Sequence, residues 1–138
     1  MASGAVSYHG PFNDQFRSIL IEKWTKTLED LEIEASEGFS LESTIGEPAK
    51  IREWNSMGLP SNSASIGNGI LLKRSCSYPF LIDPQLQALN WIKNMEAEAQ
   101  LKTVKANDEI AVMKKVEACL RLNMPCMIED ASEILPAA

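Results

Sequence analysis

The chain has 138 residues, of which 45% are hydrophobic, and its formal net charge is −6. This length and apolar content suit one domain with its own core. The acidic balance argues against a nucleic-acid binder, which needs a basic face to neutralise phosphates. No apolar run approaches the roughly 20 residues of a membrane span, and residues 1–10 lack the basic start and apolar core of a secretory signal.

The three cysteines, Cys76, Cys119 and Cys126, have no CxxC spacing. Their odd number and apolar neighbours indicate reduced, mostly buried thiols in an intracellular protein. We therefore expect neither a disulfide framework nor a metal site.

The first elements along the chain are helical in pattern. Residues 5–8 are a short strand or the end of a preceding element, and Gly10 and Pro11 break it. Asn13 or Asp14 then caps an amphipathic helix of about five turns. This helix packs on its own domain or serves as a partner helix that binds a groove. The residues on one side of this helix follow helical spacing: Phe16, Ile19, Leu20, Trp24, Thr27, Leu28 and Leu31.

Residues 32–46 are polar and are expected to be irregular. Pro48 opens a shorter helix in the first-turn position that tolerates proline, and Gly58 ends it. Residues 59–68 have loop composition. Residues 69–73, with the run Ile-Leu-Leu, are expected to form a strand.

From residue 78 onward the pattern alternates between strands and helices. Residues 78–82 predict a strand, which turns at Asp83 and Pro84 into a helix that runs to Met95. Residues 101–105 predict a second strand and residues 125–128 a third. The helix between them is capped by Asn107 or Asp108 at its start and by Asn123 at its end. Its apolar face consists of Ile110, Met113, Val116 and Leu120, widened by Val112 and Cys119. This order predicts an α/β domain with a parallel sheet and right-handed crossovers.

A short apolar strand that turns sharply into a helix is the setting of a phosphate-binding loop. A working loop reads GxxxxGK followed by Ser or Thr, because its glycines expose backbone N–H groups and its lysine supplies charge. The corresponding turn contains Asp83, Pro84, Gln85 and Gln87 and has neither glycine nor lysine. Pro84 lacks an N–H, and Asp83 would repel a phosphate. We expect Asp83 to cap the helix that starts near Pro84 or Gln85, and we expect no bound cofactor.

The third strand ends in the acidic pair Glu129 and Asp130. An apolar strand that ends in two carboxylates is the arrangement that holds magnesium and activates water beside a nucleotide. The order here is reversed from the usual Asp-Glu, and the phosphate loop is degenerate. We therefore interpret the pair as relict or surface acids. His9 is the only histidine, and no serine or cysteine has an evident base beside it, so we assign no catalytic residue.

Several stretches form a recognisable set when taken in chain order. They are Tyr8-His9-Gly10-Pro11-Phe12, Phe16-Arg17, Pro48-Ala49-Lys50-Ile51-Arg52-Glu53-Trp54-Asn55, Gly58-Leu59-Pro60-Ser61, Asn68-Gly69-Ile70, Pro79-Phe80-Leu81-Ile82-Asp83-Pro84, Gln85-Leu86-Gln87-Ala88 and Trp91-Ile92-Lys93. Together they resemble the fifth AAA+ module of a dynein heavy chain, closer to the axonemal than to the cytoplasmic type.

The resemblance implies an incomplete AAA+ (P-loop NTPase-like) α/β fold, a parallel three-layer sandwich with N-terminal helices. Residues 1–58 would lead in from the coiled-coil stalk, and residues 59–138 would form a truncated core with a degenerate phosphate loop. An AAA+ sheet has the strand order 5-1-4-3-2, and only three of those strands are expected here. We therefore expect the chain to be a fragment or a truncated product.

The resemblance also implies a mechanical, non-catalytic role in a microtubule-based, minus-end-directed motor whose parent protein is an ATPase. Its partners would be neighbouring AAA+ modules and the stalk and strut of the same heavy chain, with intermediate and light chains reached through the parent. Microtubules would be bound only by the stalk tip, which is absent here. The implied location is the axoneme of a cilium or flagellum, with the cytoplasm as the alternative. Two other hypotheses stay open: a nucleotide-binding ATPase module, and a small interaction domain that uses its first long helix.

Overall fold

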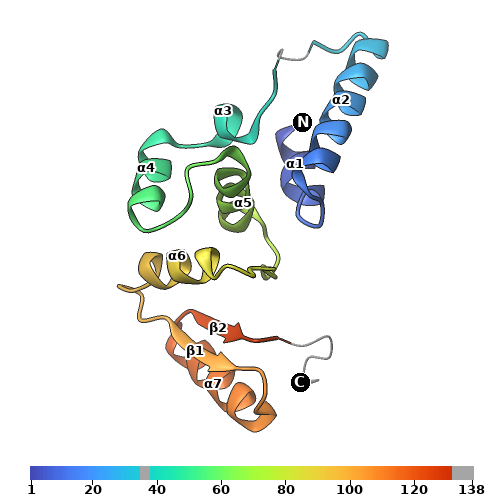
Figure 1. The fold of residues 1–138 in the computed structure, drawn as a ribbon. Coiled ribbons are helices and arrows are strands. Elements are labelled where there is room, and N and C mark those ends of the chain that lie inside the picture. The colour runs from blue at the N-terminus through green and yellow to red at the C-terminus, as the bar shows by residue number, and fades with distance from the viewer. Residues whose placement is uncertain (35–37, 132–138) are drawn as a thin grey trace. The chain divides into compact units, whose positions relative to one another are not determined.

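The computed structural model describes residues 1–34 and 38–131, which fall into two compact units, Met1–Ala88 and Leu89–Ala138. The first unit is helical, and the second contains the sheet (Figure 1). None of the described helices combines the length and the apolar content that crossing a membrane requires. The elements in order are α1 (Ala2–Tyr8), α2 (Asp14–Asp30), α3 (Leu41–Ile45), α4 (Pro48–Ser56), α5 (Ser63–Arg74), α6 (Gln87–Met95), β1 (Lys102–Lys105), α7 (Glu109–Leu122) and β2 (Cys126–Glu129).

Helices α1 and α2 form a helical hairpin that is held together by one stacked pair of aromatic rings. Asn13 caps α2, as predicted, and its side chain accepts a hydrogen bond from the Phe16 N–H at 2.9 Å. Residues 5–8 are the end of helix α1 and not a strand. His9 follows α1 and is 1% exposed, with its ring stacked on Trp24 of α2 at a centroid distance of 5.3 Å. Arg17 Nε donates to the His9 carbonyl oxygen at 3.0 Å and holds the turn.

The core of the first unit lies around α4 and α5. Pro48 stands in the first turn of α4, and Gly58 follows this helix at φ +107°, a left-handed conformation that glycine adopts at little cost. Both features confirm the predicted start and end. Ile51 and Trp54 of α4 are buried, as are Leu59 and three apolar residues of α5, namely Ile66, Ile70 and Leu71.

The predicted strand at residues 69–73 is wrong, because this run belongs to helix α5. The helix begins within the predicted loop, where the Asn62 side chain accepts from the Ser65 N–H at 2.8 Å. Ile66 and Ile70 then share one buried face at helical spacing. A short apolar run has the same composition in a buried helix and in a buried strand, so the pattern alone does not separate them. Residues 41–45, expected to be irregular, form α3, which Ser40 caps.

The second unit confirms the predicted α/β arrangement in part. Strands β1 and β2 pair in parallel, with Lys102 opposite Cys126 and Lys105 opposite Glu129. Helix α7 connects them, which is the crossover that parallel neighbours require. The Asp108 side chain caps α7 through the Ala111 N–H at 2.9 Å, and Asn123 ends it at φ +52°, both as predicted.

The predicted strand at residues 78–82 is also wrong. These residues form no helix or strand, and the side chains of Tyr78, Phe80 and Ile82 are 99%, 70% and 88% exposed. Within the described part of the chain, the sheet consists of β1 and β2, so this segment pairs with neither of them. A β-strand is stabilised by hydrogen bonds and side-chain pairs with a neighbouring strand. Residues 78–82 have no such neighbour, so their apolar composition alone does not make them a strand.

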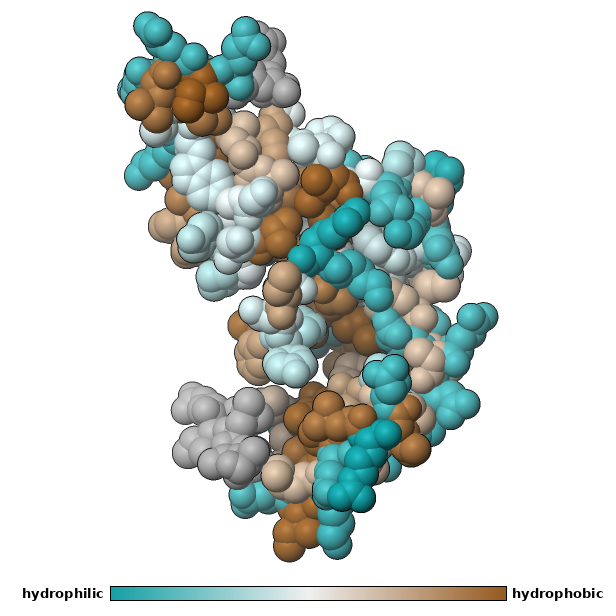
Figure 2. Space-filling view, turned by 180° about the vertical axis from the view of Figure 1, so that it is seen from behind, coloured by the Kyte–Doolittle hydropathy of each residue, from teal (hydrophilic) through white to brown (hydrophobic). Residues whose placement is uncertain are grey.

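Helix α7 buries only part of the apolar face predicted for it. Val112 and Cys119 are buried, whereas Ile110, Met113 and Leu120 are 68%, 42% and 73% exposed. The helix contacts β1 and β2, and a two-stranded sheet covers only one stripe of a helix. These exposed members of the predicted apolar face therefore lie on the surface of this unit, where apolar side chains gather in the lower part of Figure 2.

Candidate functional site

The candidate phosphate-binding turn is organised by Asp83. The Asp83 carbonyl oxygen accepts a hydrogen bond from the Leu86 N–H at 3.2 Å, and Asp83 Oδ1 accepts from the Gln87 N–H at 3.1 Å. Leu86 adopts a left-handed conformation with φ +58°, and α6 begins at the next residue, Gln87. Asp83 therefore holds the start of the helix as predicted, although the helix begins two or three residues later than expected.

The backbone N–H groups of this turn are arranged differently from those of a phosphate loop. A phosphate loop surrounds the anion with free backbone N–H groups. Here the N–H groups of Leu86 and Gln87 are bonded to Asp83, and Pro84 has none. Pro84, Gln85 and Gln87 are exposed and Asp83 is half-buried. A carboxylate at the centre of the turn adds a negative charge where a phosphate would need a positive one.

The candidate acidic pair in the second unit is engaged by lysines. Glu129 Oε1 lies 2.7 Å from Lys93 Nζ, and the Glu129 side chain is only 18% exposed. Asp130 Oδ2 lies 3.3 Å from Lys105 Nζ, and both of these side chains are well exposed. Asp130 stands just after β2 at φ +57°. Each acid therefore has an ammonium partner within its own unit, and the two acids do not converge on a shared cation.

Lys93 and Lys105 are the residues that sequence reasoning missed. Lys105 follows from the pairing register, because it ends β1 directly opposite Glu129, beside Asp130. Lys93 lies in the last turn of α6, and only the packing of that helix brings it to β2. Among the described residues there is no cluster of three or more histidine, cysteine or acidic side chains able to hold a metal ion.

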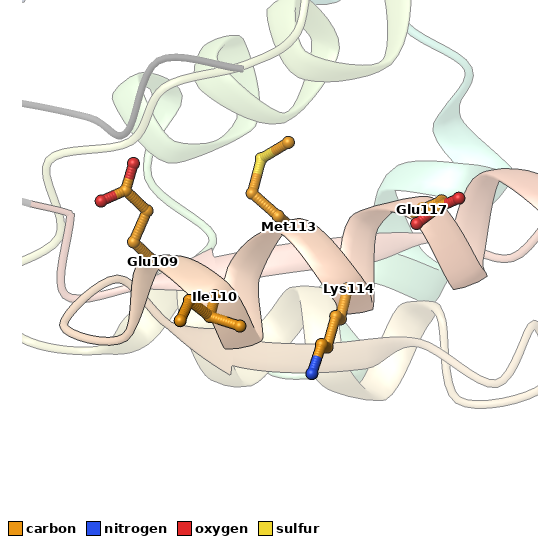
Figure 3. A pocket seen from close by; sticks show the side chains of 5 residues that line it. All are labelled: Glu109, Ile110, Met113, Lys114 and Glu117. Atoms are coloured by element: carbon orange, nitrogen blue, oxygen red, sulfur yellow. The ribbon is translucent and has the colours of Figure 1, made fainter.

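A hollow on helix α7 is lined by Glu109, Ile110, Met113, Lys114 and Glu117, all from that helix (Figure 3). Glu109 and Met113 extend to one side of the helix, and Ile110 and Lys114 to the other. A surface formed by one helix has no convergent polar groups from other elements, so it lacks the enclosure that small-molecule sites need.

Comparison with known proteins decides the family. A family model described as the ATP-binding dynein motor region matches residues 52–138. The chain therefore belongs to the dynein motor region family. It is 39% identical over its whole length to human dynein axonemal heavy chain 6, and 39% identical over 137 residues to mouse dynein axonemal heavy chain 3. It is also 38% identical over 136 residues to the dynein gamma chain of the flagellar outer arm from Chlamydomonas reinhardtii.

The dynein match covers all or nearly all of this chain but only 3% of the length of each of these relatives. The chain is thus similar to one small part of a dynein heavy chain, and its small parallel sheet with a crossover helix agrees with an AAA+-like α/β fold.

Proposed function

We propose that this chain acts as a non-catalytic, force-transmitting part of a dynein motor, in the position of the fifth AAA+ module. The observation that carries the proposal is the turn at Asp83, whose carboxylate and carbonyl oxygens hold the two N–H groups that a phosphate would need. The family description includes ATP binding. In this chain the groups that would bind nucleotide are used for helix capping and for ion pairs.

The ion pairs support a mechanical role. The contact between Lys93 of α6 and Glu129 of β2 joins a helix to the sheet, and the carboxylate is largely buried. A link of this kind resists relative movement of the two elements, because separating them would leave a largely buried carboxylate without its partner. A rigid unit of this type can pass on a movement without hydrolysing nucleotide.

The proposed position as the fifth AAA+ module also assigns roles to the two parts of the chain, partners and a location. Residues 1–58 would lead in from the stalk, and residues 59–138 would contribute to a three-layer AAA+ core. Its partners would be the neighbouring modules, the stalk and the strut of the same heavy chain, and the location would be the cytoskeleton of the axoneme. The names of the relatives, which are axonemal and flagellar, support this location.

Titration of the chain with magnesium-ATP tests the proposal. We expect no saturable binding at millimolar concentrations. Binding that is lost in Glu129→Gln or Asp130→Asn would contradict the proposal and favour the alternative of a nucleotide-binding ATPase module.

Lys93→Met is the matched control. It breaks the same ion pair but keeps the acid. If Glu129 is structural, Lys93→Met should lower the free energy of unfolding more than Glu129→Gln does, because it leaves the largely buried carboxylate without its partner. Neither variant should then affect nucleotide binding. If Glu129 holds magnesium, Lys93→Met will preserve or strengthen nucleotide binding because it frees the carboxylate.

A second candidate function, an interaction domain that uses α2, is favoured by the exposure of that helix. None of its residues is buried, and Phe16 and Ile19 are 53% and 40% exposed. The Phe12 and Phe16 rings stack at 5.4 Å and extend the apolar surface beyond the helix. Phe16→Glu with Ile19→Lys should abolish association with a neighbouring dynein segment while leaving the helicity of the chain intact. An unchanged association would exclude this surface.

A further inference from the structure

The chain reverses direction at the end of α7, between Cys119 and Cys126. Asn123 adopts a left-handed conformation, the Asn123 N–H donates to the Leu120 carbonyl at 3.3 Å, and the Met124 N–H donates to the Cys119 carbonyl at 2.9 Å. These two bonds form a Schellman motif, which reverses the chain within one turn. Cys119 is in the last turns of α7, and Cys126 is the first residue of β2, two positions after this reversal.

The sheet fixes the second cysteine. Cys126 pairs with Lys102 in the register of β1 and β2, and the Lys102 N–H donates to the Pro125 carbonyl at 3.0 Å. Cys119 is 2% exposed and Cys126 is half-buried. Burial, followed by the neighbouring Cys119 thiol, raises the pKa of the Cys126 thiol. Both thiols are free.

We propose that Cys119 and Cys126 form an oxidisable dithiol, a modification site that closes into an intrachain disulfide between α7 and β2. The oxidant is a low-molecular-weight disulfide such as oxidised glutathione. The Cys126 thiol is the more exposed of the two, so it loses its proton and attacks one glutathione sulfur, which expels one glutathione thiolate. The Cys119 thiol then loses its proton and attacks Cys126 Sγ, which expels the second glutathione. Two thiols are oxidised and one disulfide is reduced to two glutathione thiols.

The raised pKa makes the first step slow at neutral pH, because only the thiolate attacks. The second step is favoured by the fold, since the reversal after α7 holds Cys119 and Cys126 near each other and raises the effective concentration of one thiol at the other. The site would therefore oxidise slowly, faster at alkaline pH, and would remain oxidised until a reductant reaches it.

Cys76 is exposed and lies in the other unit, so it is removed to leave only the two cysteines of the proposed site. The experiment uses the 138-residue chain with Cys76→Ser, incubated with oxidised glutathione and then digested with trypsin after remaining thiols are blocked. Cleavage after Lys115 and Arg121 places Cys119 in residues 116–121 and Cys126 in residues 122–138. We expect these two peptides to appear linked and the intact chain to lose about 2 Da.

The outcomes distinguish a disulfide that the fold favours from one that any two cysteines would form. In the native chain the equilibrium constant for closing the disulfide should be at least about tenfold larger than in urea, since only the fold holds the thiols together. Equal constants, or a lasting mixed disulfide at Cys126 without linked peptides, would overturn the proposal. Cys119→Ser should convert the product into that mixed disulfide, and circular dichroism checks that this variant is folded.

Discussion

Lys93 Nζ lies 2.7 Å from Glu129 Oε1, and this pair links the last turn of α6 to the end of β2. The Glu129 side chain is 18% exposed, so solvent screens the pair less than it screens an ordinary surface contact. A double-mutant cycle with Lys93→Met and Glu129→Gln, measured by urea unfolding, should give a coupling free energy of about 1–2 kcal/mol.

The exposed pair of Lys105 and Asp130 is the matched control for that cycle. Both of its side chains are at least 66% exposed, and the distance is 3.3 Å. Its coupling free energy should be about 0–0.5 kcal/mol and should vanish in high salt. Equal coupling in both pairs would show that burial of Glu129 contributes nothing to the link.

Stability should depend on pH through His9, the only histidine in the chain. Burial, and then the charge of Arg17, lower the pKa of His9 below its ordinary value of 6.5. The folded chain thus binds a proton less readily than the unfolded chain. The free energy of unfolding is unaffected by His9 above pH 6.5 and falls as the pH drops from there toward the lowered pKa. The slope cannot exceed about 1.4 kcal/mol per pH unit.

The His9→Phe variant keeps a ring beside Trp24 but cannot be protonated. Urea unfolding between about pH 7 and about pH 5.3, where carboxylates and lysines barely titrate, should show a decline in the original chain and almost none in this variant. The same decline in both chains would assign it to other groups.

Two glycines of α5 should differ in their response to larger side chains. A Cβ at Gly67 would meet nothing within 4 Å, so Gly67→Ala should raise the free energy of unfolding by about 0.5–1 kcal/mol through helix propensity. A Cβ at Gly69 would lie 3.2 Å from Leu59 and 3.4 Å from Trp54. Gly69→Ala should gain less than Gly67→Ala, and Gly69→Val should be destabilising by about 1–3 kcal/mol because it overpacks the core. Thermal unfolding followed by circular dichroism measures all three.

Asn123, the left-handed residue that ends α7, should respond differently to alanine and to glycine. Asn123 is at φ +52°, where an ordinary side chain costs about 1–2 kcal/mol and asparagine or glycine costs less. Asn123→Ala should therefore lower the free energy of unfolding by about 1 kcal/mol, and Asn123→Gly should leave it equal or higher. A loss in both variants would mean that the asparagine side chain itself has a role.

Helix starts and ends were predictable, because they depend on the side chain of a single residue and its nearest neighbours in sequence. Asn13, Asp108 and Asn123 cap their helices as their side chains dictate, and Gly58 ends α4. The strands that form β1 and β2 were also predictable, because a crossover helix of suitable length separates them. The role of Asp83 followed from the same capping chemistry.

The remaining errors arise where neighbours decide the outcome. The Ile-Leu-Leu run of α5 suits a strand or a helix, and its contacts with Leu59 and Trp54 near Gly69 are tertiary. Residues 78–82 have strand composition, but a strand exists only where another strand accepts its hydrogen bonds. The partner of Glu129 was not predictable, because Lys93 is 36 positions away in sequence and no spacing rule connects them.

The exposed segment at residues 78–82 is also a site at which proteases can cleave the native chain. Proteases need an unfolded stretch of backbone, and exposed loops are their preferred targets. Phe80 and Leu81 are 70% and 41% exposed within such a stretch, and both suit chymotrypsin, whereas the bond after Tyr78 is protected by Pro79. Brief digestion should therefore nick the native chain after Phe80 or Leu81 before any helix is attacked, yielding one fragment with the helical core around Trp54 and another with the parallel strands.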